Sequence, residues 1–226
     1  TIQVHPDKRY AKEILNSSFG KTESWYVLNT REIDGEKSVI YMGFKKGVTR
    51  EQWEGYFYDQ DIEGMLNSLH KIEVKPGDAF MIYGGVPHAI GSGCFLMEVQ
   101  EPTDYTMRVE KTTPAGLQIT DELIHQGVGE KTMLDCFHYD DYTLEEAMDK
   151  WKVKPELVEA SEGFTFNTIF NKTHTDCFGL SELDLDGEYT VKANGSFYVI
   201  VVYHGEGTLL CNGKEYSYAQ GDEIFI

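Results

Sequence analysis

The stretch Pro76-Gly77-Asp78-Ala79-Phe80-Met81-Ile82-Tyr83-Gly84-Gly85-Val86-Pro87-His88-Ala89-Ile90 decides the fold class of this chain. A Pro-Gly-Asp turn leads into a short apolar strand, which we expect to end at the Pro87-His88 step. A strand delivers a side chain such as the His88 imidazole from a rigid element to a fixed point. Together with Gln3, His5 and Glu23, the stretch predicts one wall of a metal site inside a small β-barrel.

The rest of the chain repeats short apolar runs between Gly, Asp and Asn turns, which is the pattern of an all-β barrel or sandwich. We therefore predict a mainly β fold with a few short helices. The expected strands are 24–29, 38–43, 71–74, 79–83, 94–100, 104–109, 164–171, 177–185, 189–192, 197–204, 207–211 and 214–218. The expected hairpin turns are Asp34-Gly35, Asp186-Gly187, Asn194-Gly195 and Asn212-Gly213.

Helical patterns occupy residues 7–15, 49–69 and 143–151, of which the second begins with Thr49 and the third with Thr143 as N-caps. Gln220-Gly221-Asp222 before an apolar run echoes the Pro-Gly-Asp turn, which predicts two related β modules. We expect a metal-binding domain at 1–111, a linker or packing segment at 112–163 and a second, truncated domain at 164–226. The chain opens without Met and closes within an apolar run, as a fragment would.

Composition narrows the class of partner. The 226 residues carry a net charge of −18, which disfavours nucleic acids and anionic membranes because both require a basic surface. No apolar run is long enough for a transmembrane helix. The four cysteines are scattered without CxxC pairing, which favours reduced thiols in a cytoplasmic protein.

Four residues have the chemistry of a divalent metal site. Gln3 and His5 are two positions apart, so on a strand both side chains point to the same face, and Glu23 and His88 come from other strands. Two imidazoles and a carboxylate suit a metal such as zinc, with the Gln3 amide as a weaker ligand. A single histidine after proline is more often a structural residue, so the hypothesis depends on the four residues together.

The motifs resemble type I mannose-6-phosphate isomerase, a zinc enzyme built on paired cupin folds. The resemblance is carried by Gln3-Val4-His5-Pro6, Gly20-Lys21-Thr22-Glu23, Pro87-His88-Ala89, Glu98 and Thr106-Met107-Arg108. It implies two cupin-like (double-stranded β-helix, or jelly-roll) barrels, one zinc ion per chain, and interconversion of mannose 6-phosphate and fructose 6-phosphate through a cis-enediolate. A small sugar phosphate is then the expected partner.

The resemblance also implies roles for individual residues. The metal ligands fall on Gln3, His5, Glu23 and His88, and the active-site arginine falls on Arg108. Two further catalytic candidates are Lys21, which corresponds to a lysine close to the substrate, and Glu98, which corresponds to an acidic residue lining the pocket. Glu98 is either the acid/base group or the hydrogen-bond partner of a ligand histidine.

Three alternatives stay open at this stage. Asp104 either lines the same pocket or forms a structural pair with Arg108. A cupin dioxygenase would use iron on an open two-histidine-one-carboxylate face. A non-catalytic sugar-binding module would bind the sugar phosphate without turnover.

Overall fold

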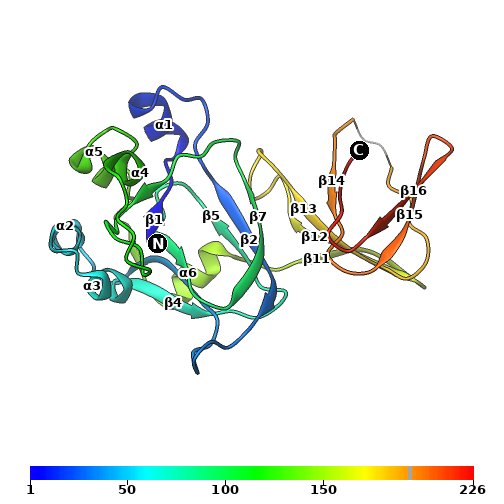
Figure 1. The fold of residues 1–226 in the computed structure, drawn as a ribbon, viewed down its shortest axis with the longest axis horizontal. Coiled ribbons are helices and arrows are strands. Elements are labelled where there is room, and N and C mark those ends of the chain that lie inside the picture. Colours follow the sequence, from blue (N-terminus) through cyan, green and yellow to red (C-terminus); the bar gives the residue numbers. More distant parts are fainter. Residues whose placement is uncertain (193–194) are drawn as a thin grey trace. The chain divides into compact units, whose positions relative to one another are not determined.

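The computed structural model describes residues 1–192 and 195–226, which form two compact units, Thr1–Asp186 and Gly187–Ile226. Strands predominate in both units, as predicted (Figure 1). In the described ranges, no helix is both long and apolar enough to cross a membrane. The predicted division at 1–111, 112–163 and 164–226 does not follow the boundary between these units and stays a prediction about domains.

Two sheets form the barrel of the first unit. One sheet runs in the order β4 (Leu69–Glu73), β3 (Val39–Lys45), β6 (His88–Ile90), β1 (Gln3–Val4) and β8 (Met107–Arg108), with β9 (Asp141–Tyr142) paired to β3. The other runs β10 (Lys152–Val153), β5 (Ala79–Ile82), β2 (Glu23–Thr30) and β7 (Cys94–Gln100), and Figure 1 shows β5, β2 and β7 side by side.

The core of the barrel lies between the two sheets, which pack face to face. Trp25 and Phe80 from one sheet pack in the same buried cluster as Ile40 and Met42 from the other. Each of these side chains is at most 1% exposed. Side chains alternate between the two faces of a strand, so every second residue points into this core. The polar residues of the candidate site occupy the same inward-facing positions.

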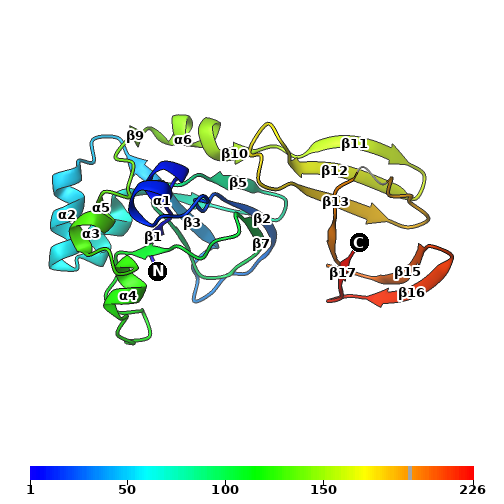
Figure 2. The same ribbon diagram turned by 90° about the horizontal axis from the view of Figure 1, so that it is seen from above.

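The helices of the first unit are α1 (Lys8–Ile14), α2 (Arg50–Asp59), α3 (Ile62–Asn67), α4 (Asp121–His125), α5 (Glu130–Leu134) and α6 (Leu144–Trp151). Buried residues of α2 to α5 share one apolar cluster with Val4 and Met107, and Figure 2 shows these four helices gathered on the same side. Reciprocal hydrogen bonds between Thr49 and Gln52, and between Thr143 and Glu146, cap α2 and α6.

The single helix predicted at 49–69 is wrong, because Gln60 adopts a left-handed conformation (φ 52°) that ends α2. Asp61 then caps α3, and the last residue of the predicted range, Leu69, begins β4. The strand expected to reach His88 is also shorter than predicted. β5 ends at Ile82, and His88 is the first residue of β6.

A further three-stranded sheet ends the first unit, in the order β11 (Glu156–Ser161), β12 (Phe164–Phe170) and β13 (Leu180–Leu185). Ile169 and Phe170 of β12 pack against Tyr26, Ala79 and Met81 on the outer face of the β5–β2 pair. The segment expected to be a linker therefore carries α4 to α6 and β9 to β11.

The second unit contains two antiparallel pairs: β14 (Val199–Val201) with β17 (Glu223–Phe225), and β15 (Glu206–Cys211) with β16 (Lys214–Ala219). The hairpin at Asn212-Gly213 is confirmed, with φ 51° and 73° at its two turn residues. The strand predicted at 189–192 and the hairpin at Asp186-Gly187 are wrong, since the next strand is β14. The turn predicted at Asn194 lies outside the described residues.

The predicted similarity between the Pro76-Gly77-Asp78 and Gln220-Gly221-Asp222 turns is confirmed by their hydrogen bonds. Gly77 adopts φ 89° and donates its backbone N–H to Val27, whose own N–H donates to Asp78 O. Gly221 adopts φ 93° and makes the same exchange with Val202 and Asp222. The Pro-Gly-Asp and Gln-Gly-Asp turns thus close onto a neighbouring strand in the same way in both modules.

Candidate metal centre

Three neighbouring strands line up the first site residues. Gln3 of β1 pairs with His88 of β6 on one side and with Arg108 of β8 on the other. Directly opposed residues of antiparallel strands point to the same face, and His5, two residues after Gln3, shares it. Met42, which pairs with His88, is fully buried in the core, so this face is the barrel interior.

Glu23 reaches the same point from the facing sheet. Its Oε1 lies 2.7 Å from His5 Nε2, and its Oε2 lies 3.7 Å from His88 Nε2. Ligand atoms of these three residues all lie within 4.8 Å of one another. All three side chains are at most 1% exposed. The fold therefore brings together two imidazoles and a carboxylate that are far apart in sequence.

Hydrogen bonds on the far side of each ring set the histidine tautomers. His5 Nδ1 lies 2.9 Å from the carbonyl of Tyr105, and His88 Nδ1 lies 2.8 Å from the carbonyl of Val86. A carbonyl oxygen only accepts, so both Nδ1 atoms carry the proton. In the neutral form, which is the form that binds a metal, each ring would then present an unprotonated Nε2 to the centre.

Acceptor atoms predominate in the centre, and Lys21 Nζ, 3.1 Å from Glu23 Oε1, is a nearby cation. His5 Nε2 and both Glu23 oxygens are buried without a hydrogen-bond partner among the described residues, although Nε2 and Oε1 are close enough for an ion pair. With Nδ1 protonated, a neutral His5 ring would turn a lone pair on Nε2 toward the carboxylate oxygen of Glu23. A cation between them would satisfy both groups, so the residues present fit a divalent metal.

The amide of Gln3 completes the donor set. Its Nε2 lies 3.2 Å from His88 Nε2, and turning the amide over would place the carbonyl oxygen there instead. An oxygen at this position is a metal ligand, whereas the nitrogen is not. Two imidazole nitrogens and two oxygens suit zinc, with no thiolate in the group.

The charge states favour the same conclusion. Burial alone would raise the pKa of Glu23, but hydrogen bonding to His5 and the nearby His88 and Lys21 outweigh it and lower the pKa to about 2. Burial, followed by the neighbouring His5, lowers the pKa of His88 to about 4. An ionised carboxylate and a neutral imidazole are the forms required of metal ligands.

Lys21 lies against the centre and not at the surface. Its Nζ is 3.1 Å from Glu23 Oε1 and donates to Thr106 Oγ1 at 3.4 Å, and the residue is 5% exposed. The cation therefore stands beside the Glu23 carboxylate in the barrel interior. Thr106 was quoted above only as part of a motif, and its contact with Lys21 was not predicted.

Glu98 of β7 pairs with Trp25 of β2, and its Oε2 accepts a hydrogen bond from Trp25 Nε1 at 2.9 Å. Burial raises the pKa of Glu98, the charge of Glu23 adds to the rise, and the bond from Trp25 opposes it. The alternative that Glu98 orients a ligand histidine is wrong, because backbone carbonyls occupy Nδ1 of both His5 and His88.

Arg108 is held by backbone groups. Its Nη1 donates to the carbonyl of Leu123 at 2.8 Å and lies 3.5 Å from the carbonyl of Thr106. Asp104 is exposed, and among the described ion pairs none joins it to Arg108, so the structural pair considered above is wrong. The Cα of Arg108 lies opposite that of Gln3, and none of the ion pairs in the described ranges involves the guanidinium.

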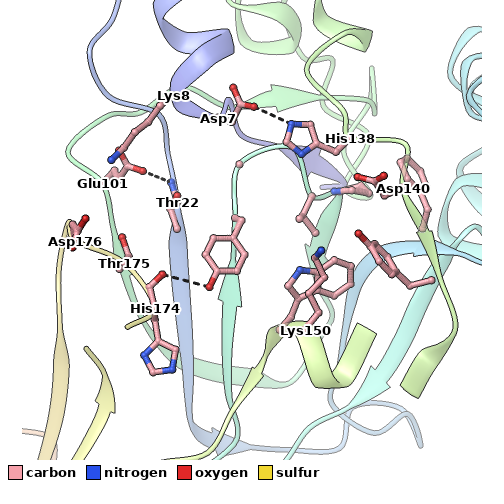
Figure 3. Close-up of a pocket in the computed structure, with 18 residues that line it drawn as sticks. Asp7, Lys8, Thr22, Glu101, His138, Asp140, Lys150, His174, Thr175 and Asp176 are labelled. Carbon is pink, nitrogen blue, oxygen red and sulfur yellow. Dashed lines mark hydrogen bonds and ion pairs between the residues drawn. The ribbon is translucent and has the colours of Figure 1, made fainter. Parts of the chain in front are cut away.

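A separate cleft of about 610 Å³ lies in the same unit, between α1, α6 and the β12–β13 connection (Figure 3). Its wall includes Lys8, Lys150 and an ion pair of 3.0 Å between Asp7 and His138. None of the metal-centre residues lines it. A large cleft is often the first site to consider, but the unsatisfied buried acceptors of the metal centre are the stronger indication of a ligand.

Comparisons with known proteins point to one family. The family model "Mannose-6-phosphate isomerase, cupin domain" matches residues 167–226. Mannose-6-phosphate isomerase ManA of Bacillus subtilis is 24% identical over 242 residues, covering all of this chain and 64% of that protein. The crystal structure of the mannose 6-phosphate isomerase from Bacillus subtilis superposes with a TM-score of 0.75 at 25% identity, again over the whole chain and 64% of the other.

The chain is therefore similar along its whole length to mannose-6-phosphate isomerases, and its residues 167–226 match the cupin-domain model of that family. The predicted resemblance and the mainly β, cupin-like fold are thereby confirmed. The chain spans 64% of the length of the curated Bacillus subtilis relatives that it matches from end to end. A more distant solved member, from Salmonella typhimurium, was obtained with fructose 6-phosphate and zinc, and it shares the fold at a TM-score of 0.63 and 16% identity.

Proposed function

We propose that this protein is a zinc-dependent aldose-ketose isomerase that interconverts mannose 6-phosphate and fructose 6-phosphate. The observation that carries the proposal is the convergence of two imidazoles and a carboxylate, His5, His88 and Glu23, within 4.8 Å of one another, with His5 Nε2 and the Glu23 oxygens buried and Gln3 beside them. Bound zinc would supply Lewis-acid stabilisation of negative charge on the sugar oxygens. The Salmonella relative's zinc and fructose 6-phosphate support the same metal and substrate class.

The chain's own cations address the charge that develops during the reaction. Isomerisation removes a proton from the carbon beside the carbonyl, which leaves a cis-enediolate with negative oxygens. Lys21 Nζ, 3.1 Å from Glu23 Oε1, stands within reach of those oxygens and is shielded from water. Arg108 adds a guanidinium that stays protonated and presents paired donors.

Glu98 carries the proton in this proposal. It would take the proton from C2 of the aldose and return it to C1, while the proton of the C2 hydroxyl passes to the oxygen on C1; the reverse reaction would use the same group. Burial and the charge of Glu23 raise its pKa, which makes the carboxylate a stronger base than an exposed one. Its Oε2 is bound to Trp25, so Oε1 is the oxygen left to exchange the proton.

The metal assignment is tested by comparing two buried histidines. His88→Ala should lose bound zinc, because it removes a ligand nitrogen, and activity should fall with it. His70→Ala is the matched control: His70 is also buried in the barrel, but its Nε2 faces the carbonyl of Tyr142. Zinc is measured by atomic emission after dialysis. Full zinc content in His88→Ala would refute the assignment.

The catalytic assignments are tested by kinetics on zinc-loaded protein. Arg108→Ala should lower kcat while zinc stays bound, because Arg108 offers no ligand atom; loss of zinc would instead indicate a structural role. Glu98→Gln should lower kcat far more than it changes KM. Glu182→Gln is its control, since Glu182 also accepts a bond from an aromatic residue of β2, Tyr26, but from the outer packing layer. A near-native rate in Glu98→Gln would exclude Glu98 as the base.

Two rival functions give different results in the same measurements. Stoichiometric redox-active iron would favour a cupin dioxygenase. Sugar-phosphate binding without turnover, in this chain and in the longer protein alike, would favour a binding module. The cytoplasmic location and the lack of nucleic-acid or membrane partners remain predictions from composition.

A further inference from the structure

Trp25 lies between the metal centre and the proposed base. It follows Glu23 by two positions on β2, so both side chains point into the barrel. Its Cα is paired with that of Glu98 on β7. The residue is fully buried, although an indole carries an N–H that must be satisfied there.

The indole touches both neighbours. Its Nε1 donates to Glu98 Oε2 at 2.9 Å. Its ring meets the His88 ring edge to face, with centroids 5.4 Å apart and planes at 77°. One rigid side chain thus contacts a metal-ligand imidazole and the carboxylate proposed to move the proton.

The other two tryptophans show that this bond is not a general result of burial. Trp53 and Trp151 are equally buried, yet the Nε1 atoms of both have no hydrogen-bond partner among the described residues. Trp151 even belongs to the same core cluster as Trp25. The sequence therefore provides an internal comparison between a tryptophan with a carboxylate partner and one that only packs.

We propose that Trp25 is the positioning residue for the proton transfer: it holds Glu98 Oε2 as a fixed acceptor, so that Oε1 alone faces the substrate carbon. An indole N–H only donates, so it selects an oxygen that carries no proton. The fixed ring also keeps Glu98 and His88 at a constant separation. This inference rests on the proposed function, because it explains how Glu98, the proposed base, is held in position.

The first experiment needs no turnover. ¹H–¹⁵N spectra of the full chain should show three indole N–H signals, from Trp25, Trp53 and Trp151, assigned by Trp→Phe variants. Glu98→Ala should move the Trp25 signal strongly upfield, because it removes a charged acceptor, and leave the Trp151 signal in place. An unmoved Trp25 signal would overturn the proposed contact, whatever the activity of the protein.

The second experiment separates positioning from packing. Trp25→Phe and Trp151→Phe each remove an indole from one core cluster, so a packing effect should be similar in both. We expect Trp25→Phe to lower kcat by about 10- to 100-fold with nearly unchanged KM and zinc content, and Trp151→Phe to stay near the wild-type rate. Equal losses in both variants, or loss of zinc from Trp25→Phe, would overturn the inference.

The two proposals fail in distinguishable ways. A wild-type protein that binds zinc without isomerising sugar phosphates refutes the proposed function, while the indole spectra still test the Trp25–Glu98 contact. An active wild type with an equally active Trp25→Phe variant refutes the positioning role alone. If Trp25→Phe does not fold, the response of the Trp25 signal to Glu98→Ala decides the question.

Discussion

The buried imidazole of His88 should make the metal-free chain sensitive to mild acid. Burial and His5 lower its pKa to about 4 in the folded chain, against an ordinary value of 6.5 when unfolded. The unfolded chain therefore binds more protons between these values, so the free energy of unfolding falls as the pH drops from 6.5 towards 4. A difference of about 2.5 pKa units corresponds to a loss of about 3 kcal/mol.

The Glu23 carboxylate affects the free energy of unfolding at lower pH than His88 does. The pKa of Glu23 is lowered from 4.5 to about 2, so its contribution is present above pH 4.5 and is lost as the pH falls towards 2. Measurements above pH 4.5 thus exclude the Glu23 contribution, while Glu98, whose pKa burial raises above 4.5, contributes there with the opposite sign. Burial also lowers the pKa of His70, which adds an effect of the same sign as that of His88. The difference between wild type and a His88 variant is therefore the quantity that reports His88.

Urea unfolding of zinc-free protein, followed by tryptophan fluorescence from pH 7 to 4.5, measures this difference. All three tryptophans lie in the first unit and are at most 2% exposed, so the signal reports the barrel. His88→Gln should remove most of the pH dependence, while His204→Gln, an exposed position in the second unit, should leave it unchanged. An identical pH dependence in wild type and His88→Gln would refute the reasoning. Saturating zinc should shift the window to lower pH, because the metal holds the neutral ring.

Three further changes have defined outcomes. Gly43→Ala should destabilise the barrel by about 2–4 kcal/mol in urea unfolding, because the added Cβ would lie 2.1 Å from the Trp151 ring at a φ of +67°; a cost near zero would contradict that packing. Thr143→Ala should cost about 1 kcal/mol by breaking the capping box with Glu146, and an unchanged urea midpoint would show that the cap is dispensable. His5→Ala should abolish zinc uptake in equilibrium dialysis, and retention of one zinc per chain would remove His5 from the ligand set.

Local sequence signals predicted much of the fold. The capping pairs Thr49/Gln52 and Thr143/Glu146 gave correct helix starts because the side chains and the backbone donors they satisfy lie three residues apart. The Gly77 and Gly221 turns were recognisable for the same reason. The break at Gln60 was missed because a left-handed non-glycine residue leaves little trace in a sequence.

The candidate site was only partly predictable. The resemblance named Gln3, His5, Glu23 and His88, but their convergence depends on strand register, which a single sequence does not encode locally. The histidine tautomers are set by backbone carbonyls, which every residue has, so the sequence does not indicate which tautomer forms. Trp25 was detectable in principle, since it shares the inward phase of Glu23, but an aromatic residue at that position indicates a core before it indicates a site.

The position of β1 in its sheet has a consequence for how the protein is made. Gln3 pairs with residues that follow it by 85 positions (88 − 3) and 105 positions (108 − 3). A ribosome adding roughly 5–20 residues per second needs about 5–20 seconds to supply both partners. During that interval the segment around Gln3 lacks its neighbours on either edge, and unpaired strands are prone to pair wrongly. Vectorial synthesis therefore leaves β1 without both of its neighbours until β8, 105 positions after Gln3 (108 − 3), has been made.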